Sequence, residues 1–325
     1  MDYTITTNNG VHKNMKKVLV TGTCGFIFSN FVRTIKNVDY EFVGVDKLIE
    51  EHNLKNVDPK YKLHIGDIAD VHFMDRVFAI EKPDIVIHGA AESFVDNSIK
   101  KALPFIHSNV LGTQIVVDMC MKFHVEKLMY VSTDEVYGQL ESQHDKSWTE
   151  KDPINPRNPY SASKAAGELI VKAANQTHGL NYIITRCCNN FGPRQPPRNL
   201  VPKIITSVLA RQNIPIHGSG EQIREWLYVN DHCNAIMFLI NNGKVNEIYN
   251  IGSGNECTNV EMVTNICYLI GYSGDLIKHV ADRPGHDFRY SIDNSKILEL
   301  GWKPSYTFEK GLEECVNWYL DDAKH

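Results

Sequence analysis

The sequence has no segment that would place the protein in a membrane or on a nucleic acid. It contains no apolar run of membrane length, and its polar N-terminus, MDYTITTNNGVHKN, lacks the apolar core of a signal peptide. Lys and Arg form no basic run, and the formal net charge is -5. We therefore expect a cytoplasmic protein without membrane or nucleic-acid partners, in which residues 1–14 form a disordered leader.

Motifs for disulfides and metals are missing as well. The eight cysteines have neither paired disulfide spacing nor a C-x-x-C pattern, and the fourteen histidines form no H-E-x-x-H pair. A chain of 325 residues also buries enough core to fold without covalent cross-links. The sequence predicts reduced thiols and no bound metal.

The first half of the chain contains an alternation of short Val- and Ile-rich runs with longer amphipathic stretches. This alternation is typical of strand-helix-strand units and predicts an α/β fold with a Rossmann-type, doubly wound parallel sheet. Ligands of such sheets collect where the strands end. The predicted strands are Lys17–Thr21, Glu41–Asp46, Lys62–His64, Ile85–His88, Lys127–Ser132 and Asn181–Arg186.

The composition changes near Asn189 to Pro-rich loops, short strands and aromatic residues. This change predicts a smaller C-terminal α/β lobe that covers the sheet edge and holds the substrate. We expect residues 15–188 to form the first domain and residues 189–325 mainly the second, with some segments returning to the first. Helical stretches at about 104–122 and 161–178 carry apolar residues at helical spacing, and we expect a homodimer from their pairing.

A glycine-rich turn follows the first predicted strand. In TGTCGFIF, Gly22 and Gly25 permit a tight turn whose backbone N–H groups reach a pyrophosphate at a helix N-terminus. Asp46 ends the next strand, where a carboxylate can bind the adenosine ribose of NAD and repel the extra phosphate of NADP. The sequence therefore favours NAD, bound by the first domain, although two glycines alone would suit a purely structural turn. Phe28 stands where such turns usually have a third glycine, so either the helix stands off the sheet or the ring fills a local pocket.

Tyr160 and Lys164 lie one helical turn apart, directly after an Asn-Pro pair that indicates a helix start. In isolation the two residues are more typical of an exposed helix start. Beside a nicotinamide, the Lys164 ammonium and the nicotinamide charge would lower the pKa of Tyr160 into the range of a useful base, and Lys164 would hold the nicotinamide ribose. The glycine turn, Asp46 and the Y-x-x-x-K pattern together resemble the extended short-chain dehydrogenase/reductase superfamily.

Thr133, Asp134 and Glu135 follow the predicted strand that ends at Ser132. Two carboxyl groups in different protonation states can supply the acid and the base that eliminate water beside a ketone, although a solvated loop or a helix cap is an alternative. The string TDEVYG resembles the active-site motif of dTDP-glucose 4,6-dehydratases, a family in which we include UDP-glucose 4,6-dehydratases. The resemblance extends over both lobes, through HGAAESFVDNS, YSASKAAGE, IHGSGEQIREWLYVNDH and DRPGHDFRY.

This resemblance implies catalytic roles for five residues. Tyr160, assisted by Lys164, would deprotonate the hydroxyl on sugar carbon 4 while NAD takes hydride from the same carbon. Glu135 would then remove the proton on carbon 5, and Asp134 would protonate the hydroxyl that leaves carbon 6, to which the hydride returns. Thr133 would hydrogen-bond the oxygen on carbon 4.

The resemblance also implies two sets of contacts. The NAD contacts are Gly22, Gly25, Phe26, Ile27, Asp46, Lys47, Asp67, Ile68, Ala90, Ala91, Ser93, Ser108, Tyr160, Lys164 and Asn190. The substrate contacts are Ser93, Thr133, Asn189, Asn199, Leu200, Pro215, Ile216, His217, Arg224, Asn259, Asp282, Arg283, His286 and Arg289. Arg224 is the natural ligand for the diphosphate, and Arg289 is expected to assist it.

The sequence departs from the dehydratase pattern at three positions, where Phe28 replaces a glycine or small residue, Phe94 a histidine and Asn199 a lysine. A nucleotide-sugar epimerase or decarboxylase of the same superfamily would share the glycine turn and the Tyr-Lys pair without needing Asp134. A non-catalytic NAD-binding sensor, the third alternative, would have no use for Tyr160 and Lys164. The choice between dTDP-glucose and UDP-glucose stays open, because one methyl group discriminates only roughly ten- to two-hundred-fold.

Overall fold

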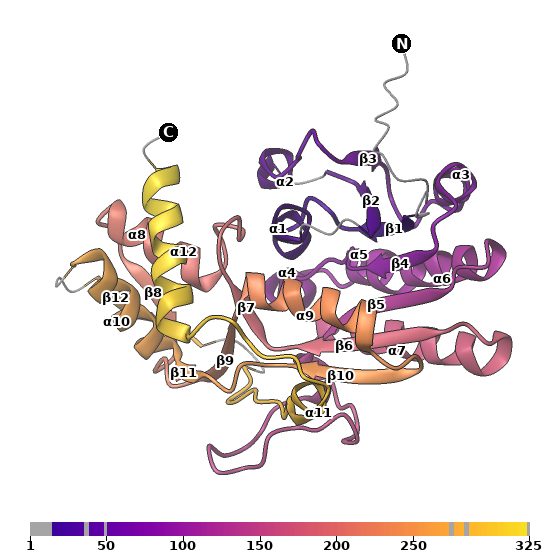
Figure 1. Cartoon of the computed structure of the whole chain (residues 1–325). Coiled ribbons are helices and arrows are strands. Elements are labelled where there is room, and N and C mark those ends of the chain that lie inside the picture. Colours follow the sequence, from indigo (N-terminus) through magenta and orange to yellow (C-terminus); the bar gives the residue numbers. More distant parts are fainter. Residues whose placement is uncertain (1–14, 36–38, 49–50, 273–275, 283–285, 324–325) are drawn as a thin grey trace.

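The computed structural model describes residues 15–35, 39–48, 51–272, 276–282 and 286–323, and the predicted leader, residues 1–14, lies outside these ranges. Within them, seven strands form one parallel sheet in the order β10-β6-β5-β4-β1-β2-β3 (Figure 1). The predicted Rossmann-type fold is therefore confirmed. The strands are β1 (Lys16–Thr21), β2 (Tyr40–Asp46), β3 (Lys62–Ile65), β4 (Ile85–His88), β5 (Lys127–Thr133), β6 (Tyr182–Cys187) and β10 (Glu247–Ile251).

Six of these strands are those expected from the sequence, each shifted by at most one residue at either end. Their pattern is nearly continuous in apolar residues because both faces of the sheet are buried. In β1, Val18 and Val20 pack into the hydrophobic cluster on one face, and Leu19 packs into the cluster on the other. The seventh strand, β10, comes from the second half of the chain.

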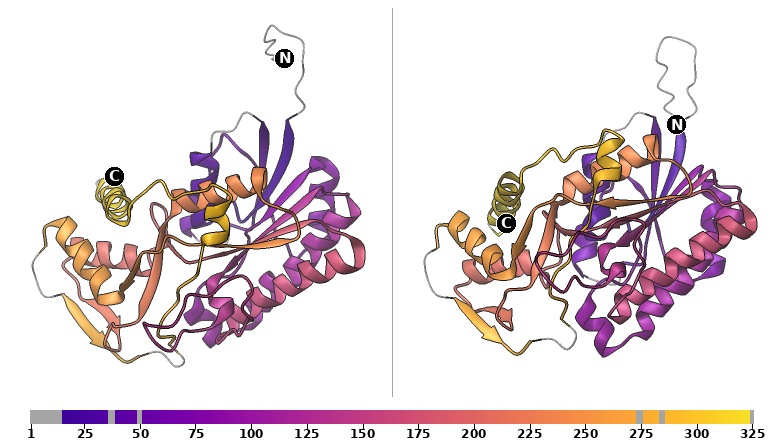
Figure 2. Two further views of the ribbon diagram at one scale, coloured as in Figure 1. Left: turned by 60° about the horizontal axis from the view of Figure 1, so that its bottom comes forward. Right: turned by 90° about the horizontal axis from the view of Figure 1, so that it is seen from below.

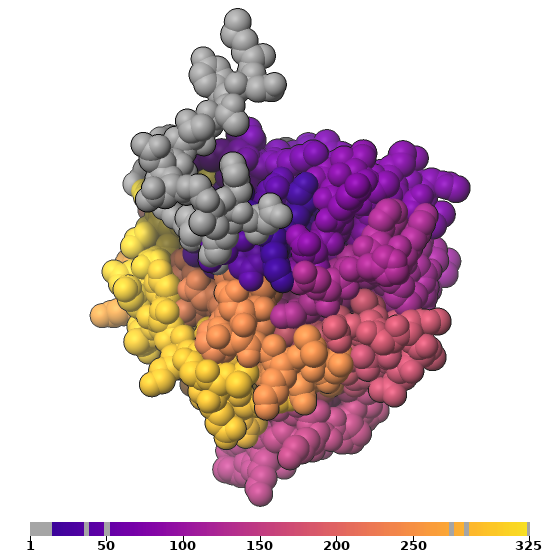
Figure 3. Space-filling view, turned by 45° about the vertical axis from the view of Figure 1, so that its right-hand side comes forward, coloured from indigo at the N-terminus to yellow at the C-terminus, as the bar shows by residue number. Residues whose placement is uncertain are grey.

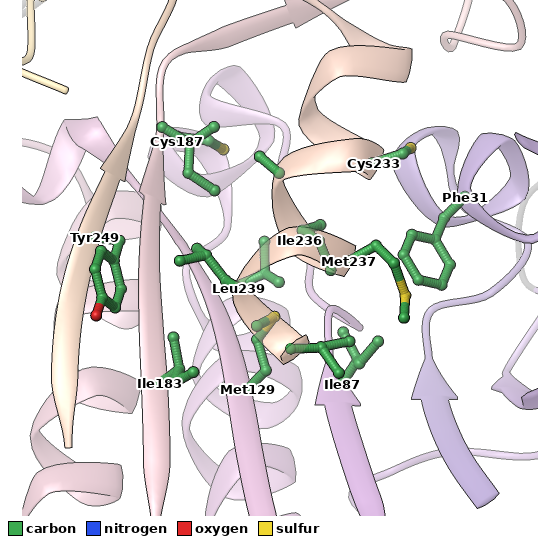
Figure 4. Packing of buried hydrophobic residues seen from close by; sticks show 14 of the residues in the cluster. Phe31, Ile87, Met129, Ile183, Cys187, Cys233, Ile236, Met237, Leu239 and Tyr249 are labelled. Carbon is green, nitrogen blue, oxygen red and sulfur yellow. The ribbon is translucent and has the colours of Figure 1, made fainter. Parts of the chain in front are cut away.

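Helices cover both faces of this sheet (Figure 2). The helical elements around it are α1 (Phe26–Thr34), α2 (Glu51–Lys55), α3 (Val71–Glu81), α4 (Val95–Lys100), α5 (Leu103–Phe105), the π-helix η1 (Ile106–Leu111), α6 (Gly112–Lys122), the 3-10 helix η2 (Asp134–Tyr137), α7 (Pro159–His178), α9 (Val229–Asn242) and α11 (Ser295–Glu299). On one face, Ile236 and Leu239 of α9 pack with Met129 of β5 (Figure 4). On the other, Met74 of α3 and Val171 of α7 belong to one buried cluster.

The second half of the chain supplies a smaller lobe and two elements of the first. The lobe contains β7 (Asn189–Phe191), α8 (Leu200–Leu209), β8 (Ile214–His217), β9 (Ile223–Tyr228), β11 (Glu256–Thr258), α10 (Asn259–Ile270), β12 (Ile277–Val280) and α12 (Phe308–Asp322). Strands β11, β9 and β7 form one small sheet, and β12 and β8 another. By contrast, α9 packs on α1 and β10 joins the large sheet, so the orange surface of Figure 3 lies directly beside the magenta surface of the first half. No helix in the described ranges is both long and apolar enough to span a bilayer.

Phe28 is accommodated by a pocket, the second of the two alternatives that the sequence left open. Its ring is buried over Gly89, where an ideal Cβ atom would lie only 1.8 Å from Phe28 Cε2. The ring also makes an edge contact with Phe31, with 5.8 Å between ring centroids. The side chain that is absent at Gly89 therefore provides the space for the large side chain at position 28, and α1 keeps its place on the sheet.

Candidate active site

A cavity of about 560 Å³ runs along the ends of the parallel strands and into the second lobe. Its wall includes residues at or just after the ends of five strands, which are Gly22, Asp46, Gly89, Thr133 and Cys187. Open α/β sheets bind their ligands at this edge. The volume lies within the range of roughly 300–1,000 Å³ that is usual for ligand sites.

The glycine turn brings the start of α1 close to the end of β4. Gly22 has a φ of +78°, and a Cβ atom at this position would lie 2.8 Å from the Ala90 Cα atom. Gly25 is the N-cap of α1, and its backbone N–H bonds the Gly22 carbonyl at 3.0 Å. Only glycine combines this conformation and this close contact at position 22. The N-terminus of α1 is therefore available at the cavity wall as an anion-binding group.

Asp46 and Lys47 hold the neighbouring part of the wall. The Asp46 carboxylate accepts hydrogen bonds from the backbone N–H groups of Cys24 and Leu48, both at 2.9 Å. Lys47 Nζ donates to the Ser108 hydroxyl at 3.0 Å. The end of β2, the glycine turn and η1 are thus joined, and their predicted cofactor contacts share one wall.

Thr133 ends β5, and Asp134 and Glu135 begin η2 directly after it. The Thr133 hydroxyl accepts a hydrogen bond from the Glu135 backbone N–H at 3.3 Å and donates to Asp134 Oδ1 at 3.2 Å. Thr133 is therefore the N-cap of η2, and both carboxylic residues line the cavity. The alternative that the carboxyl pair serves merely as a helix cap does not hold, because the threonine fills that role.

The surroundings of Asp134 favour its protonated form. The residue is 3% exposed, and its Oδ2 has no hydrogen-bond partner among the described residues. Burial raises the pKa of Asp134 well above its usual value, and the charges of Glu135 and Glu225 raise it further. A buried, protonated carboxyl group beside a second carboxyl group can act as a general acid.

Tyr160 and Lys164 lie at the start of α7, and both line the cavity. Lys164 Nζ donates to the Val131 carbonyl at 2.7 Å, and burial lowers its pKa to about 8. Burial, followed by the Glu135 charge, raises the pKa of Tyr160 well above its usual value, while a hydrogen bond with Thr133 lowers it. Burial thus dominates the pKa of Tyr160 in the protein without cofactor, and its lowering beside a bound nicotinamide and the Lys164 ammonium stays a prediction.

Arg224 provides a fixed cation on the second-lobe side of the cavity. Its guanidinium donates to the carbonyls of Ile223 at 2.7 Å and Asp287 at 2.9 Å, and it lies 4.5 Å from the centroid of the Tyr290 ring. Arg283, a further predicted contact, lies outside the described residues. The other predicted substrate contacts that line the cavity are Ser93, Asn189, Asn199, Leu200, Pro215, Ile216, His217, Asn259 and His286.

Three predicted contacts do not line the cavity. Asp67 accepts a hydrogen bond from the Ala69 backbone N–H at 2.8 Å, and Asp282 Oδ1 lies within hydrogen-bond distance of His286 Nδ1, at 2.6 Å. Arg289 donates to both carboxylate oxygens of Glu256, at 2.6 and 2.7 Å. This bidentate pair balances the Arg289 charge and links it to β11, and its expected part in binding the diphosphate stays a prediction.

Two contacts in the cavity wall were not evident from the sequence. Asn158, the N-cap of α7, donates from Nδ2 to Glu135 Oε2 at 3.1 Å, across 23 residues of sequence. The Asn-Pro pair signals a helix start but says nothing about this partner. The Arg198 guanidinium carbon lies 5.0 Å from the centroid of the Phe94 ring, and both residues line the cavity. The departure at Phe94 thus provides a face on which a cation rests.

Several buried polar atoms of the cavity wall have no hydrogen-bond partner among the described residues. They include Asn53 Oδ1, Ser132 Oγ, Asp134 Oδ2, Asn190 Oδ1 and Gln195 Oε1. Buried polar atoms are normally paired, so this wall suits a ligand that brings its own hydrogen-bonding groups. Together with the glycine turn, it fits a dinucleotide along the sheet and a polar substrate toward the second lobe.

Known proteins are similar to this chain over nearly its whole length. Residues 18–252 match the NAD dependent epimerase/dehydratase family. The low-salt glycan biosynthesis protein Agl12 of Haloferax volcanii is 45% identical over 311 residues, which cover 94% of this chain and 99% of that protein. A dTDP-glucose 4,6-dehydratase of Streptomyces niveus is 41% identical, over 94% of this chain and 93% of that protein.

A solved structure extends the similarity to three dimensions. DesIV, the dTDP-glucose 4,6-dehydratase of Streptomyces venezuelae with NAD and TYD bound, superimposes with a TM-score of 0.88 at 40% identity. The match covers 95% of this chain and 98% of DesIV, and therefore includes both lobes. The resemblance noted from the TDEVYG motif is confirmed.

Proposed function

The chain belongs to the NAD-dependent epimerase/dehydratase family, and we propose that it is a 4,6-dehydratase of a nucleoside-diphosphate glucose, with dTDP-glucose or UDP-glucose as its substrate. The observation that carries the proposal is the buried Asp134, whose pKa is raised by burial and by the Glu135 charge, beside Glu135 in the cavity wall. A nucleotide-sugar epimerase or decarboxylase needs no such acid, and a non-catalytic NAD-binding sensor needs neither carboxyl group.

We assign the sheet side of the cavity to NAD. The glycine turn would receive the pyrophosphate, Asp46 the adenosine ribose and Lys164 the nicotinamide ribose. Asn190 Oδ1, which has no hydrogen-bond partner within the described part of the chain, offers a further acceptor in the same cavity. A bound NAD would supply the acceptor for the hydride of sugar carbon 4 and the source of the hydride that carbon 6 receives. This assignment makes residues 15–188, joined by α9 and β10, the NAD-binding domain, and most of residues 189–325 the substrate-binding domain.

Three residues would then move the protons of the reaction, and a fourth, Thr133, would stabilise the oxygen on carbon 4. Tyr160 as phenolate takes the proton of the carbon 4 hydroxyl, and Thr133 hydrogen-bonds the oxygen left on that carbon. The resulting ketone acidifies the hydrogen on carbon 5, which Glu135 removes. The C5–H electrons form the C5=C6 double bond, the C6–O bond breaks, and the proton of Asp134 completes the leaving water. Glu135 returns its proton to carbon 5 as carbon 6 is reduced, and solvent restores the protonation of Tyr160 and Asp134.

The test of this function is loss of water from a sugar nucleotide without net oxidation. The purified protein would be incubated with NAD and either dTDP-glucose or UDP-glucose in separate reactions. The masses of the products would be measured by mass spectrometry. We expect at least one of the two sugar nucleotides to lose one water molecule while reduced cofactor does not accumulate. The ratio of the kcat/KM values for the two substrates then identifies the preferred nucleotide. An intact sugar with NAD bound would overturn the proposal.

Asp46→Asn is expected to weaken NAD binding roughly tenfold and to narrow the preference for NAD over NADP. The amide keeps the size of the side chain but loses the charge that binds ribose hydroxyls and repels an added phosphate. Calorimetric titration with both cofactors measures the two affinities. Asp75→Asn is the matched control, because Asp75 lies on α3, pairs with Lys122 and does not line the cavity, so both affinities should stay unchanged. If the ratio of NAD affinity to NADP affinity were unaltered in Asp46→Asn, Asp46 would not be the residue that binds the adenosine ribose.

The homodimer expected from the sequence has a candidate surface on α5, η1 and α7. These neighbouring elements expose Leu103 at 74%, Leu169 at 56% and Ile106 at 48%. Exposed apolar side chains gathered on adjacent helices are typical of an interface between subunits. We therefore place a twofold contact there. The predicted cytoplasmic location stays a prediction.

Changing both Leu103 and Leu169 to Glu is expected to convert the dimer to a monomer, because two buried carboxylates would repel across a twofold interface. Light scattering coupled to gel filtration measures the mass of each species. Ile80→Glu, at a residue of α3 that is 62% exposed, is the control and should leave the mass unchanged. A monomeric wild type would overturn the expected homodimer. A double variant that remains dimeric would place the contact on another surface.

A further inference from the structure

Asn158 makes contacts at both ends of its amide. Its Oδ1 accepts a hydrogen bond from the Ser161 backbone N–H at 2.8 Å, which caps the first turn of α7. Its Nδ2 donates to Glu135 Oε2 at 3.1 Å. The backbone donor from Ser161 requires an oxygen at that end of the amide, so the nitrogen end is the one that meets the carboxylate.

Capping alone does not explain an asparagine at this position. Asp, Ser and Thr cap helices about as well as Asn, because each offers an oxygen to the first backbone N–H groups. Of these side chains, only Asn caps with an oxygen and still carries two N–H donors for a carboxylate. The residue is also held by Pro159 at the first helical position and by the Ser161 side chain, which completes a capping box.

The fixed Asn158 donor restricts the orientation of the Glu135 carboxylate. Glu135 lies half-buried on η2, a helix of four residues, where its own backbone does little to restrict its side chain. Asn158 precedes Tyr160 by two residues, and all three line the same cavity. The amide therefore ties the carboxylate of Glu135 to the helix that presents the Tyr160 phenol.

We propose that Asn158 is a positioning residue for the elimination step, which aims the Glu135 carboxylate at the carbon that loses its proton. The inference rests on the proposed dehydratase function and assigns different residues to its oxidation and elimination steps. Oxidation at carbon 4 depends on Tyr160 and proceeds without Asn158. Removal of the carbon 5 proton depends on the geometry of Glu135 and requires the Asn158 amide.

Asn158→Ser separates the two contacts, because serine keeps the helix cap and loses the donor to Glu135. We expect kcat to fall roughly 10- to 100-fold with KM nearly unchanged, since misplacing a reacting group by about 1 Å has effects of this size. Reduced nicotinamide should accumulate on the enzyme during turnover, visible by its near-ultraviolet absorbance, because oxidation continues while elimination is slow. The thermal midpoint should remain that of the wild type.

Two further variants complete the test. Asn158→Ala loses both contacts and should show the kinetic defect of the serine variant together with a Tm lower by roughly 1–3 °C. Asn158→Asp keeps the cap but sets a second carboxylate against Glu135, and should be the slowest of the three at an unchanged Tm. Affinity for thymidine or uridine diphosphate, measured by calorimetry without turnover, should be the same in all of them.

The outcomes separate this inference from the function on which it rests. If the wild type releases water and Asn158→Ser does so at the same rate without reduced nicotinamide accumulating, Asn158 serves as a cap only and the inference is overturned. If activity falls only in Asn158→Ala, in step with its Tm, the inference is likewise overturned. If the wild type itself releases no water from either sugar nucleotide, the dehydratase function fails first.

Discussion

Asp134→Asn is expected to lower the rate of water elimination roughly 10²- to 10⁴-fold, the range that a positioned general acid contributes. The amide has the shape of the carboxyl group but no proton for the departing hydroxyl on carbon 6. Asp134 is buried, and its Oδ2 bonds none of the described residues, so that oxygen is available to a ligand in the cavity. Glu135→Gln should cause a loss of similar size, because the amide cannot accept the carbon 5 proton.

Both variants should still oxidise carbon 4, because Tyr160 and Lys164 are unchanged. Single-turnover experiments would then show reduced nicotinamide and a 4-keto sugar with all its oxygen atoms, detected by absorbance and mass spectrometry. Tyr160→Phe provides the contrast, since it should stop the reaction before any cofactor is reduced. Full turnover by Asp134→Asn would mean that another group protonates the leaving hydroxyl.

Stability separates the chemical effect of Asp134→Asn from unfolding. The folded-state pKa of Asp134 is raised above that of the unfolded chain, so its contribution to stability is fully present below the unfolded pKa and is lost as pH rises through the folded pKa. At high pH an ionised Asp134 would be buried at a cost, whereas Asn stays neutral. The variant should therefore match the wild type in Tm at low pH and equal or exceed it at high pH. A lower Tm in the variant at high pH would contradict the raised pKa.

The parts of the site that could be predicted from the sequence are those set by local pattern. The strand ends, the glycine turn and the Thr133-Asp134-Glu135 string depend on neighbours within a few residues, and each lies at the cavity as expected. The same holds for Tyr160 and Lys164, whose shared helix face follows from their spacing.

The rest depends on contacts between distant segments. No pattern in the sequence reveals that Arg289 forms a bidentate pair with Glu256, which lies on β11. The raised pKa of Tyr160 follows from burial, which helical spacing alone cannot supply. The partner of Asn158 is equally remote, at 23 residues. Sequence reasoning found the reactive groups, and the fold determined which of them are paired, buried or exposed to a ligand.

Gly89→Ala is expected to destabilise the wild type by about 1–3 kcal/mol, the usual cost of inserting a methyl group into a packed core. Gly89 has no positive φ, so its backbone accepts alanine, and the cost arises from the Phe28 ring, which would lie 1.8 Å from the new Cβ atom. The buried ring cannot simply swing away, because it packs against Phe31 and the core on that face. Displacement of α1 should also weaken NAD binding.

Removing the ring should change the sign of that effect. Phe28→Ala alone should lower the free energy of unfolding by about 3–5 kcal/mol, because it loses buried apolar surface and leaves a cavity. Adding Gly89→Ala to this variant should be neutral or slightly stabilising, because the new methyl group enters that cavity. Urea unfolding of the two single variants and the double variant measures the coupling. Phe78→Ala is the control background, since Phe78 is equally buried but packs on the opposite face of the sheet, and Gly89→Ala should remain destabilising there. If Gly89→Ala cost the same free energy of unfolding in the wild-type and Phe28→Ala backgrounds, positions 28 and 89 would be independent of each other. The absent side chain at position 89 would then not explain how a phenylalanine occupies the place of the third glycine.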